Sequence, residues 1–278
     1  MKIEVKKVFN NNVILVHELE KNVEAVVVGK GIGFGKKNGK QYELDESDIS
    51  KVFKNMDSEL GKEYNDLIKL VDPEVIGLTE EIIQYATSKL GELNYHIHIM
   101  LTDHIAFAIE RLKDDQEIIN PFLYEIKALY PREFEVSEYA KNLINKRMGI
   151  MIPDGEKGFI AMHIHSAMKN KAVKETVENA RILTEVIEII EEYMNIRIKK
   201  DDLSYVRLVH HINTAIIRME TNHEIENPLL DNIKKEMKSS FILANKIGNH
   251  IVEAKGISIN EHELGYLALH IERLSKIS

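Results

Sequence analysis

The spacing of apolar residues divides the chain into a short N-terminal part and a long remainder. In residues 1 to 55, β-branched and apolar runs of strand length occur in KKVFNNNVILVHE and VEAVVVGKGIGF, and NNN, EKN and a glycine cluster provide turns. We expect a small antiparallel sheet of roughly four strands, whose core is too thin for much stability on its own. Pairing with a second copy of the chain would stabilise such a sheet.

From about residue 60 onward the apolar pattern becomes helical. Segments such as LTEEIIQYATSKL, NARILTEVIEIIEEYM and YVRLVHHINTAIIRM place apolar residues three and four positions apart, with charges on the opposite face. The chain has five prolines, and Pro121, Pro153 and Pro228 fall between helical runs. The remainder of the chain is therefore predicted to be all α-helical.

The helical part contains an internal repeat, in which residues match those 107 positions later. The matched pairs include His104 and His211, Arg111 and Arg218, Asn120 and Asn227, Phe134 and Phe241, Gly149 and Gly256, Gly158 and Gly265, and His163 and His270. We therefore predict a multi-domain protein, with a small dimerising antiparallel β-sheet domain followed by two homologous all-α helical bundles. The boundaries that we expect are 1–56 for the sheet domain and 57–170 and 171–278 for the bundles.

Composition and charge narrow the classes of protein. The chain has 278 residues and no cysteine, which excludes disulfides, thiolate metal sites and cysteine nucleophiles. No stretch approaches the roughly 18 uncharged apolar residues of a membrane span, and the N-terminus MKIEVKKV lacks the apolar core of a signal peptide. We expect a cytoplasmic protein without membrane insertion. The net charge is −8, but residues 1 to 55 carry ten Lys against eight Asp and Glu, so a polyanion is expected to bind there.

The stretch GKGIGFGKK, residues 29 to 37, contains four glycines and three lysines and suggests a phosphate site. A Walker P-loop needs four residues between its first glycine and the Gly-Lys pair and then Ser or Thr, whereas here Gly31 and Gly35 are separated by three and Lys37 follows. The dinucleotide pattern GxGxxG fails as well, because Phe34 and Lys36 stand where its third glycine is needed. Neither nucleotide-binding motif is therefore present in this stretch.

Two histidines occur at matched positions in each copy of the repeat, namely His104, His163, His211 and His270. Arg111 follows His104 by two helical turns on nearly the same face, as Arg218 follows His211. A neutral imidazole nitrogen is a nucleophile at pH 7, and a guanidinium suits a phosphoryl group. The pattern indicates histidine phosphoacceptors with two arginines as phosphate contacts. Two alternatives stay open: satisfied histidines of a helical bundle, and arginines that are solvated or ion-paired.

A metal site is the competing interpretation of the histidines. His96 and His98, and likewise His163 and His165, form HxH pairs, which face one way on a strand but diverge by about 200° on a helix. Both pairs lie in helical or near-helical sequence, no HExxH motif occurs, and the carboxylates are scattered. We therefore expect no metal site, no cofactor and no catalytic residues.

Five motifs together resemble a known family. They are NNNV at 10 to 13, VVVGKGIGFGKK at 26 to 37, LTDHIAFAIERL at 101 to 112, GFIAMHIH at 158 to 165 and GYLALHIERL at 265 to 274. Their order and spacing over essentially the whole chain resemble the BglG-type transcriptional antiterminators, most closely those of glucose permeases. The resemblance implies a dimerising RNA-binding sheet domain, which binds an RNA hairpin called a ribonucleic antiterminator, and two phosphotransferase-system (PTS) regulation domains.

The resemblance also implies roles for individual residues of the sheet domain. The residues at or near the positions where the family contacts RNA are Lys7, Asn10, Asn12, Gly29, Lys30, Gly31, Phe34 and Lys36. Glycines let a backbone approach RNA closely, Phe34 offers a ring for stacking, and lysines attract phosphates. Lys30 stands where relatives often have Arg, so we expect a phosphate contact rather than bidentate base recognition. A tight glycine turn with a core Phe34 and solvated lysines is the alternative.

In the helical domains, the resemblance implies phosphorylation of all four repeated histidines. Asp103 precedes His104 as in the family, where it supplies an orienting carboxylate, but the equivalent residue in the second copy is His210. The register of the repeat identifies His211 as the acceptor, and His210 stays open as an alternative. The implied partners are a second copy of the chain, the EIIB domain of a sugar permease, which phosphorylates and inactivates through the first copy, and the phosphocarrier HPr, which acts on the second.

Two other classes of protein stay open. A PTS-regulated DNA-binding activator would need a helix-turn-helix, whereas the N-terminal pattern indicates strands. A metal or phosphoryl-transfer enzyme would need a nucleotide loop or a metal triad, and neither pattern occurs. We therefore expect a regulatory RNA-binding protein rather than an enzyme.

Overall fold

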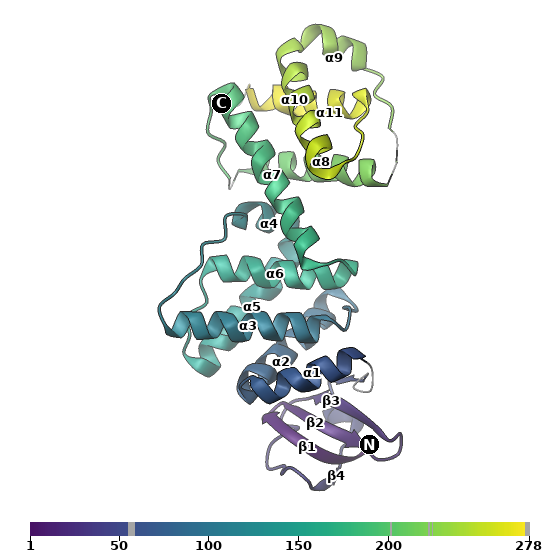
Figure 1. Ribbon diagram of the computed structural model, residues 1–278, viewed down its shortest axis with the longest axis vertical. Helices are drawn as coiled ribbons and strands as arrows, with labels where there is room; N and C mark the ends of the chain where they lie inside the picture. Colours follow the sequence, from purple (N-terminus) through teal and green to yellow (C-terminus); the bar gives the residue numbers. More distant parts are fainter. Residues whose placement is uncertain (55–58, 201, 222, 224, 276–278) are drawn as a thin grey trace. The chain divides into compact units, whose positions relative to one another are not determined.

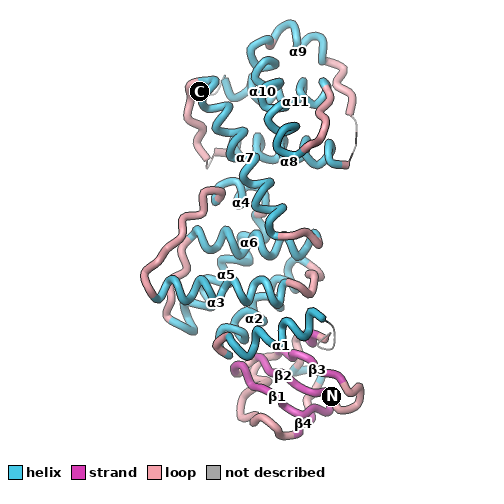
Figure 2. Tube along the Cα trace, viewed as in Figure 1, coloured by secondary structure: helices cyan, strands magenta, loops and turns pink. Residues whose placement is uncertain are grey.

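The computed structural model describes the chain except for residues 55–58, 201, 222, 224 and 276–278 (Figure 1). The described part of the chain forms two compact units. The first comprises residues 1–121 and 130–173, and the second comprises residues 122–129 and 174–278. Among the described residues, strands occur only at the N-terminal end of the first unit (Figure 2).

The N-terminal sheet is antiparallel, as predicted, with the strand order β4-β1-β2-β3-β5. The strands are β1 (Lys2–Asn10), β2 (Val13–Glu18), β3 (Val23–Val28), β4 (Gln41–Glu43) and β5 (Lys51–Phe53). The sheet has more strands than we expected, because β4 and β5 contain only three residues each and are too short to show a periodic pattern.

Both faces of the sheet are buried. Side chains alternate between the faces of a strand, so Val13 and Leu15 of β2 belong to a core shared with helices, and Ile14 and Val16 belong to a separate core. The separate core also holds Ile32 from the glycine stretch. The helix that packs most closely on the sheet is α2 (Pro73–Leu90), which lies beside α1 (Glu59–Leu70) in Figure 1. Helices of the same chain thus supply burial that an isolated sheet would lack.

The rest of both units is helical, which confirms the prediction from periodicity. The first unit contains α1 (Glu59–Leu70), α2, α3 (Ile97–Lys113), α5 (Pro131–Met148) and α6 (Asp154–Lys169). The second unit is formed by α4 (Leu123–Leu129), α7 (Val173–Met194), α8 (Leu203–Glu220), α9 (Leu230–Glu236), α10 (Lys238–Lys255) and α11 (Glu261–Ser275). Within these ranges, no helix combines the length and the apolar character needed to cross a membrane.

The internal repeat of the sequence reappears in the helices. The bounds of α4 and α9, and those of α5 and α10, differ by the same 107 residues. Gly149 and Gly256 end α5 and α10 with φ angles of 71° and 66°, a left-handed conformation that favours glycine. The matched glycines therefore terminate equivalent helices. The three expected domain boundaries stay a prediction.

Candidate functional sites

The turn between β1 and β2 and the glycine stretch form one structure. The backbone oxygen of Asn12 accepts a hydrogen bond from the Gly29 N–H at 2.9 Å, and that of Asn11 accepts one from the Gly33 N–H at 2.9 Å. The side-chain oxygen of Asn12 accepts a third hydrogen bond from the Gly31 N–H, also at 2.9 Å. Three glycines of the stretch are therefore held against the asparagine turn.

Close contact explains why this stretch needs glycine. A Cβ atom at Gly33 would lie 2.2 Å from the backbone oxygen of Asn10, and a Cβ atom at Gly29 would lie 2.0 Å from that of Asp48. Gly31 has open space around it, but its φ of 69° lies in the left-handed region. The stretch is therefore a tight turn, and its exposed backbone at Gly31 is open to close approach.

Phe34 and the lysines beside it form the exposed part of this structure. Phe34 is 76% exposed, so it is not the core residue that the alternative interpretation required. Lys30 is exposed, whereas Lys36 is half-buried with its Nζ 4.9 Å from the centroid of the Tyr42 ring. The exposed ring can stack on a base, and the neighbouring lysines can attract phosphates.

The other three residues with an implied RNA role contact helices of the same unit. Lys7 donates a hydrogen bond from Nζ to the backbone oxygen of Ile68 in α1 at 2.7 Å. The side-chain amides of Asn10 and Asn12 each donate to Glu81 in α2 at 3.0 Å. The structure thus places all eight residues in the sheet domain but engages these three with helices.

His104 and His163 form a pair in the first unit. α3 carries His104 and α6 carries His163, and their ring centroids lie 4.8 Å apart. Glu156, in the first turn of α6, has one oxygen 3.3 Å from His104 Nε2 and the other 2.5 Å from an Arg111 nitrogen. Arg111 is therefore ion-paired, as one of the alternatives held. Glu156, and not the exposed Asp103, supplies the carboxylate beside His104.

His211 and His270 form the corresponding pair in the second unit. Their rings, on α8 and α11, stack with centroids 3.5 Å apart. Arg218 donates to both carboxylate oxygens of Glu263, at 2.6 and 2.8 Å. Both His210 and His211 are exposed, but it is His211 whose ring stacks on His270.

Glu156 and Glu263 belong to these sites although we did not predict them. Like the histidines, they are separated by 107 residues, and each lies two residues before a matched glycine. The repeat therefore contained the signal that identifies them. Glu156 and Glu263 form ion pairs with Arg111 and Arg218, the two arginines that we predicted to contact a phosphate.

Burial keeps His163 and His270 neutral at pH 7. Burial and the neighbouring His104 lower the pKa of His163 to about 3. Burial and the neighbouring His211 lower the pKa of His270 to about 4, and burial also lowers the pKa of His211. A neutral imidazole keeps the lone pair that nucleophilic attack on phosphorus requires.

The lowered pKa of His163 predicts a loss of stability in acid. The unfolded chain takes up this proton near the ordinary pKa of 6.5, whereas the folded chain takes it up only near 3, so stability falls as the pH drops through this window. We expect His163→Gln to lose less free energy of unfolding than the wild type between neutral pH and about pH 4.5. Urea unfolding at the two pH values measures the difference, and an equal loss in both proteins would contradict this account.

The members of the HxH pairs diverge, as expected on helices. Nδ1 of His98 lies 2.9 Å from both carboxylate oxygens of the buried Glu80. Nδ1 of His165 lies 2.8 Å from Glu133 instead. In the part of the chain that the structure describes, no group of three or more His, Cys, Asp or Glu residues is arranged to hold a metal ion.

Comparisons with known proteins cover the whole chain. The family model of the CAT RNA binding domain matches residues 3–61, and that of the PRD domain matches residues 80–167 and 184–274. The chain is 34% identical to the transcription antiterminator LicT of Bacillus subtilis (strain 168), with 99% of each chain covered. It is 36% identical to the PtsGHI operon antiterminator of the same organism, with 99% of this chain and 98% of the relative covered. The crystal structure of GlcT CAT-PRDI matches with a TM-score of 0.51 and 40% identity, over 61% of this chain and 100% of that chain.

Proposed function

The chain belongs to the family of transcription antiterminators that combine a CAT RNA-binding domain with PRD domains, and we propose that it binds a hairpin in the leader RNA of a sugar PTS operon. Binding holds the hairpin closed and prevents the overlapping terminator from forming. The protein acts in the cytoplasm as a homodimer and catalyses no reaction of its own. Relatives named PtsGHI operon antiterminator and GlcT favour glucose as the controlling sugar.

The exposed Phe34 supports the proposal most directly. Its ring stands in solvent beside Lys30 and the open backbone of Gly31, in a segment that the asparagine turn holds in place. An exposed aromatic ring at this place is free to stack on an RNA base. We assign the RNA contacts to the eight residues named above, with Phe34 at their centre.

The four repeated histidines receive the regulatory signal. The EIIB domain of the permease phosphorylates the pair His104 and His163, and HPr phosphorylates the pair His211 and His270. In each transfer, the N–P bond of the donor phosphohistidine breaks and an N–P bond to the acceptor imidazole forms, so no nucleotide, metal or oxidant is consumed. The phosphoryl group brings about −1.5 to −2 charges to a side chain that was neutral.

The carboxylate beside His104 determines whether phosphorylation stabilises or disturbs the helix packing around it. A phosphoryl group on His104 would lie beside Glu156, which is buried and paired with Arg111. Burial opposes ionisation of Glu156, but its hydrogen bonds to His104 and Arg111 hold its pKa below the ordinary value, so it is anionic. The two anions repel, and this repulsion disturbs the packing of α3 on α6.

A gel-shift titration with the full-length chain and the leader RNA tests the proposed function. The full chain is required because the sheet packs one face on helices, and residues 1–56 alone would expose Val13, Leu15 and Phe53. We expect an unlabelled RNA hairpin to compete and duplex DNA of the same sequence to fail. Competition by duplex DNA alone would favour the DNA-binding activator instead.

A further inference from the structure

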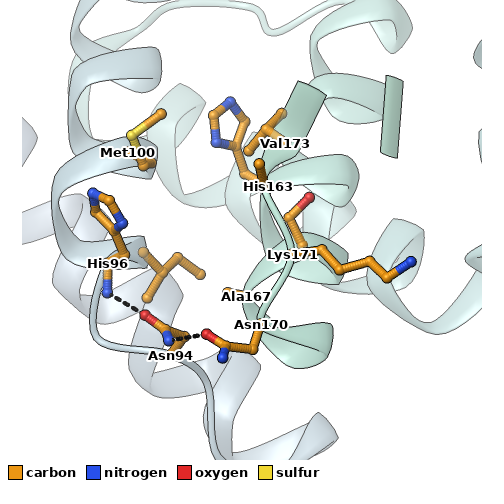
Figure 3. A pocket seen from close by; sticks show the side chains of 11 residues that line it. Asn94, His96, Met100, His163, Ala167, Asn170, Lys171 and Val173 are labelled. Atoms are coloured by element: carbon orange, nitrogen blue, oxygen red, sulfur yellow. Dashed lines mark hydrogen bonds between the residues drawn. The ribbon is translucent and has the colours of Figure 1, made fainter. Parts of the chain in front are cut away.

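The internal repeat places a cavity beside the second histidine of each copy. In the first unit, a cavity of about 310 Å³ is lined by Met100, His163 and Ser166 among others, and Figure 3 shows Met100 and His163 on it. The residues 107 positions later line a cavity of about 200 Å³ in the second unit, and they are Arg207, His270 and Arg273. The two cavities are therefore equivalent in position.

Two residue differences change the chemistry of this cavity. The thioether of Met100 in the first copy corresponds to the guanidinium of Arg207 in the second, and the hydroxyl of Ser166 corresponds to the guanidinium of Arg273. Arg207 and Arg273 are exposed, and neither forms an ion pair with any residue that the structure describes. The second cavity is therefore lined by two guanidiniums, whereas the first has a single ammonium, that of Lys171, and no arginine in its lining.

The spacing along α8 and α11 places both arginines on the same helix faces as the histidines. Arg207 lies four residues before His211 on α8, and Arg273 lies three residues after His270 on α11, so each arginine shares a helix face with its histidine. All four residues line the same cavity. A guanidinium is always charged and binds phosphate oxygens in a bidentate geometry. The cavity thus combines two anion-binding groups with two nucleophiles.

We propose that Arg207 and Arg273 hold the phosphoryl group of a phosphorylated His211 or His270, and that the first copy lacks this anchor. The inference rests on the proposed function, because it takes the repeated histidines as acceptors. In the second copy, the charge of the phosphoryl group is neutralised where it arises. In the first copy, the same charge meets Met100 and Ser166 in place of the two arginines, while the carboxylates of Glu156 and Glu263 lie at equivalent positions in the two copies. The two copies therefore differ in the positive charge that they offer to a phosphoryl group on the histidine pair.

Exchanging residues between the copies tests this proposal. In the full-length chain, Arg207→Met with Arg273→Ser gives the second cavity the residues of the first. Phosphoramidate, a small phosphoryl donor, labels histidines without a partner protein, and mass spectrometry reads the label on each one. We expect labelling of His211 and His270 to fall about tenfold in this variant, with His104 and His163 unchanged as the internal control.

A second readout separates this proposal from the proposed function. Calorimetric titration with inorganic phosphate should show binding to the wild type that weakens about tenfold in the double variant, whether or not any relay protein labels the chain. Equal labelling and equal phosphate affinity in the two proteins would overturn the anchor. Arginine-dependent phosphate binding, together with no label from the complete phosphorelay, would leave the anchor and overturn the proposed function. Circular dichroism checks that the exposed substitutions leave the fold intact.

A separate observation carries a second inference, which concerns Glu81 on α2. Its two carboxylate oxygens accept hydrogen bonds from Asn10 and Asn12, both at 3.0 Å, and Arg147 donates to the same carboxylate at 3.1 Å. The side-chain oxygens of both asparagines are used within the sheet domain, by the N–H groups of Asn12 and Gly31. Glu81 therefore takes the side-chain donors that these asparagines would offer to a ligand.

Packing at Gly77 shows how closely α2 approaches this site. A Cβ atom at Gly77 would lie 2.2 Å from the side-chain nitrogen of Asn10, so any larger residue displaces the asparagine. Lys7 is engaged as well, through the backbone oxygen of Ile68 near the end of α1. Helices of the first unit therefore occupy three of the eight residues assigned to RNA.

We infer that Glu81 competes with RNA for Asn10 and Asn12, so that the structure represents a closed form of the RNA-binding face. This inference also rests on the proposed function, because it takes both asparagines as RNA contacts. A carboxylate accepts the same amide donors that a phosphate or a base oxygen would accept. Opening requires α2 to move away from the end of β1.

Substitution of Glu81 tests the competition. We expect Glu81→Ala in the full-length chain to bind the leader RNA about tenfold more tightly, because two hydrogen bonds no longer oppose binding. Glu74→Ala is the matched control: Glu74 lies on the same helix and pairs with the same Arg147 at 3.1 Å, but it does not contact the asparagines. Gly77→Ala should also raise the affinity without changing any charge.

Three results distinguish the possible failures. An equal gain in RNA affinity in Glu74→Ala and Glu81→Ala would show that the effect comes only from removing a negative charge. It would overturn the proposed competition. Unchanged affinity in Glu81→Ala, with normal binding by the wild type, would overturn it and leave the proposed function intact. RNA binding by none of the variants would overturn both.

Discussion

Replacing Phe34 with alanine should weaken binding of the leader RNA by about tenfold to a hundredfold, because stacking of one base on an aromatic ring contributes roughly 1–3 kcal/mol. Phe34 is 76% exposed and contributes little to the core, so the fold should be unaffected. Fluorescence anisotropy with a labelled hairpin measures the dissociation constant. The free energy of unfolding should stay within about 0.5 kcal/mol of the wild type.

Ile119→Ala is the matched control for this prediction. Ile119 is 85% exposed, lies outside the sheet domain and loses a comparable apolar side chain. It should leave RNA affinity unchanged. Equal affinities of Phe34→Ala and the wild type would show that the exposed ring does not contact RNA, and they would remove the main support for the assigned RNA-binding face.

Replacing Glu80 with alanine should lower the free energy of unfolding by about 3 kcal/mol, because it leaves two buried polar side chains without a partner. Glu80 accepts a hydrogen bond from the Tyr64 hydroxyl at 2.6 Å and lies 2.9 Å from His98 Nδ1. All three side chains are almost fully buried, and they join α1, α2 and α3. The His98 ring also packs edge-on against Phe53 of β5, with centroids 4.3 Å apart.

Tyr64→Phe is the milder variant for comparison. It removes only the hydroxyl and should cost about 1 kcal/mol, since Glu80 keeps its contact with His98. Urea denaturation measures both variants. If Glu80→Ala were no less stable than Tyr64→Phe, the buried network would not stabilise the packing of α1, α2 and α3.

Periodicity predicted the helices well because each of them buries one long face. The 107-residue repeat predicted equivalent helices without any structure, down to the matched glycines Gly149 and Gly256. The strand β5 escaped prediction because its three residues show no alternation, and its position is set by pairing of Phe53 with Val26. Such pairing depends on contacts distant in sequence, which a local pattern does not contain.

The candidate sites were only partly predictable. The repeat identified the four histidines, but not that they would meet as two pairs, because their partners lie on different helices. The glutamate partners of Arg111 and Arg218 were not predicted for the same reason: each arginine binds a glutamate 45 residues away, on another helix. The contact of Glu81 with Asn10 joins the sheet to α2, and nothing in the local pattern of either segment indicates it.

Under the proposed function, regulation through the first histidine pair and recognition of RNA share one unit. The first histidine pair lies on α3 and α6, and α3 is tied through His98 and Glu80 to α2, which carries Glu81. A phosphoryl group that disturbs α3 therefore acts on the helix that contacts the asparagine turn. The second pair lies in the other unit and has its own arginines.

The most direct test compares RNA affinity before and after phosphorylation. The full-length chain is incubated with the complete sugar phosphorelay, and mass spectrometry locates the phosphoryl groups while anisotropy measures binding of the leader hairpin. The account predicts that the repeated histidines are labelled and that phosphorylation weakens RNA binding. It also predicts that phosphorylation no longer changes RNA affinity when His104 and His163 are both replaced by alanine. Label on none of the four histidines, or the same loss of affinity in the double variant, would contradict it.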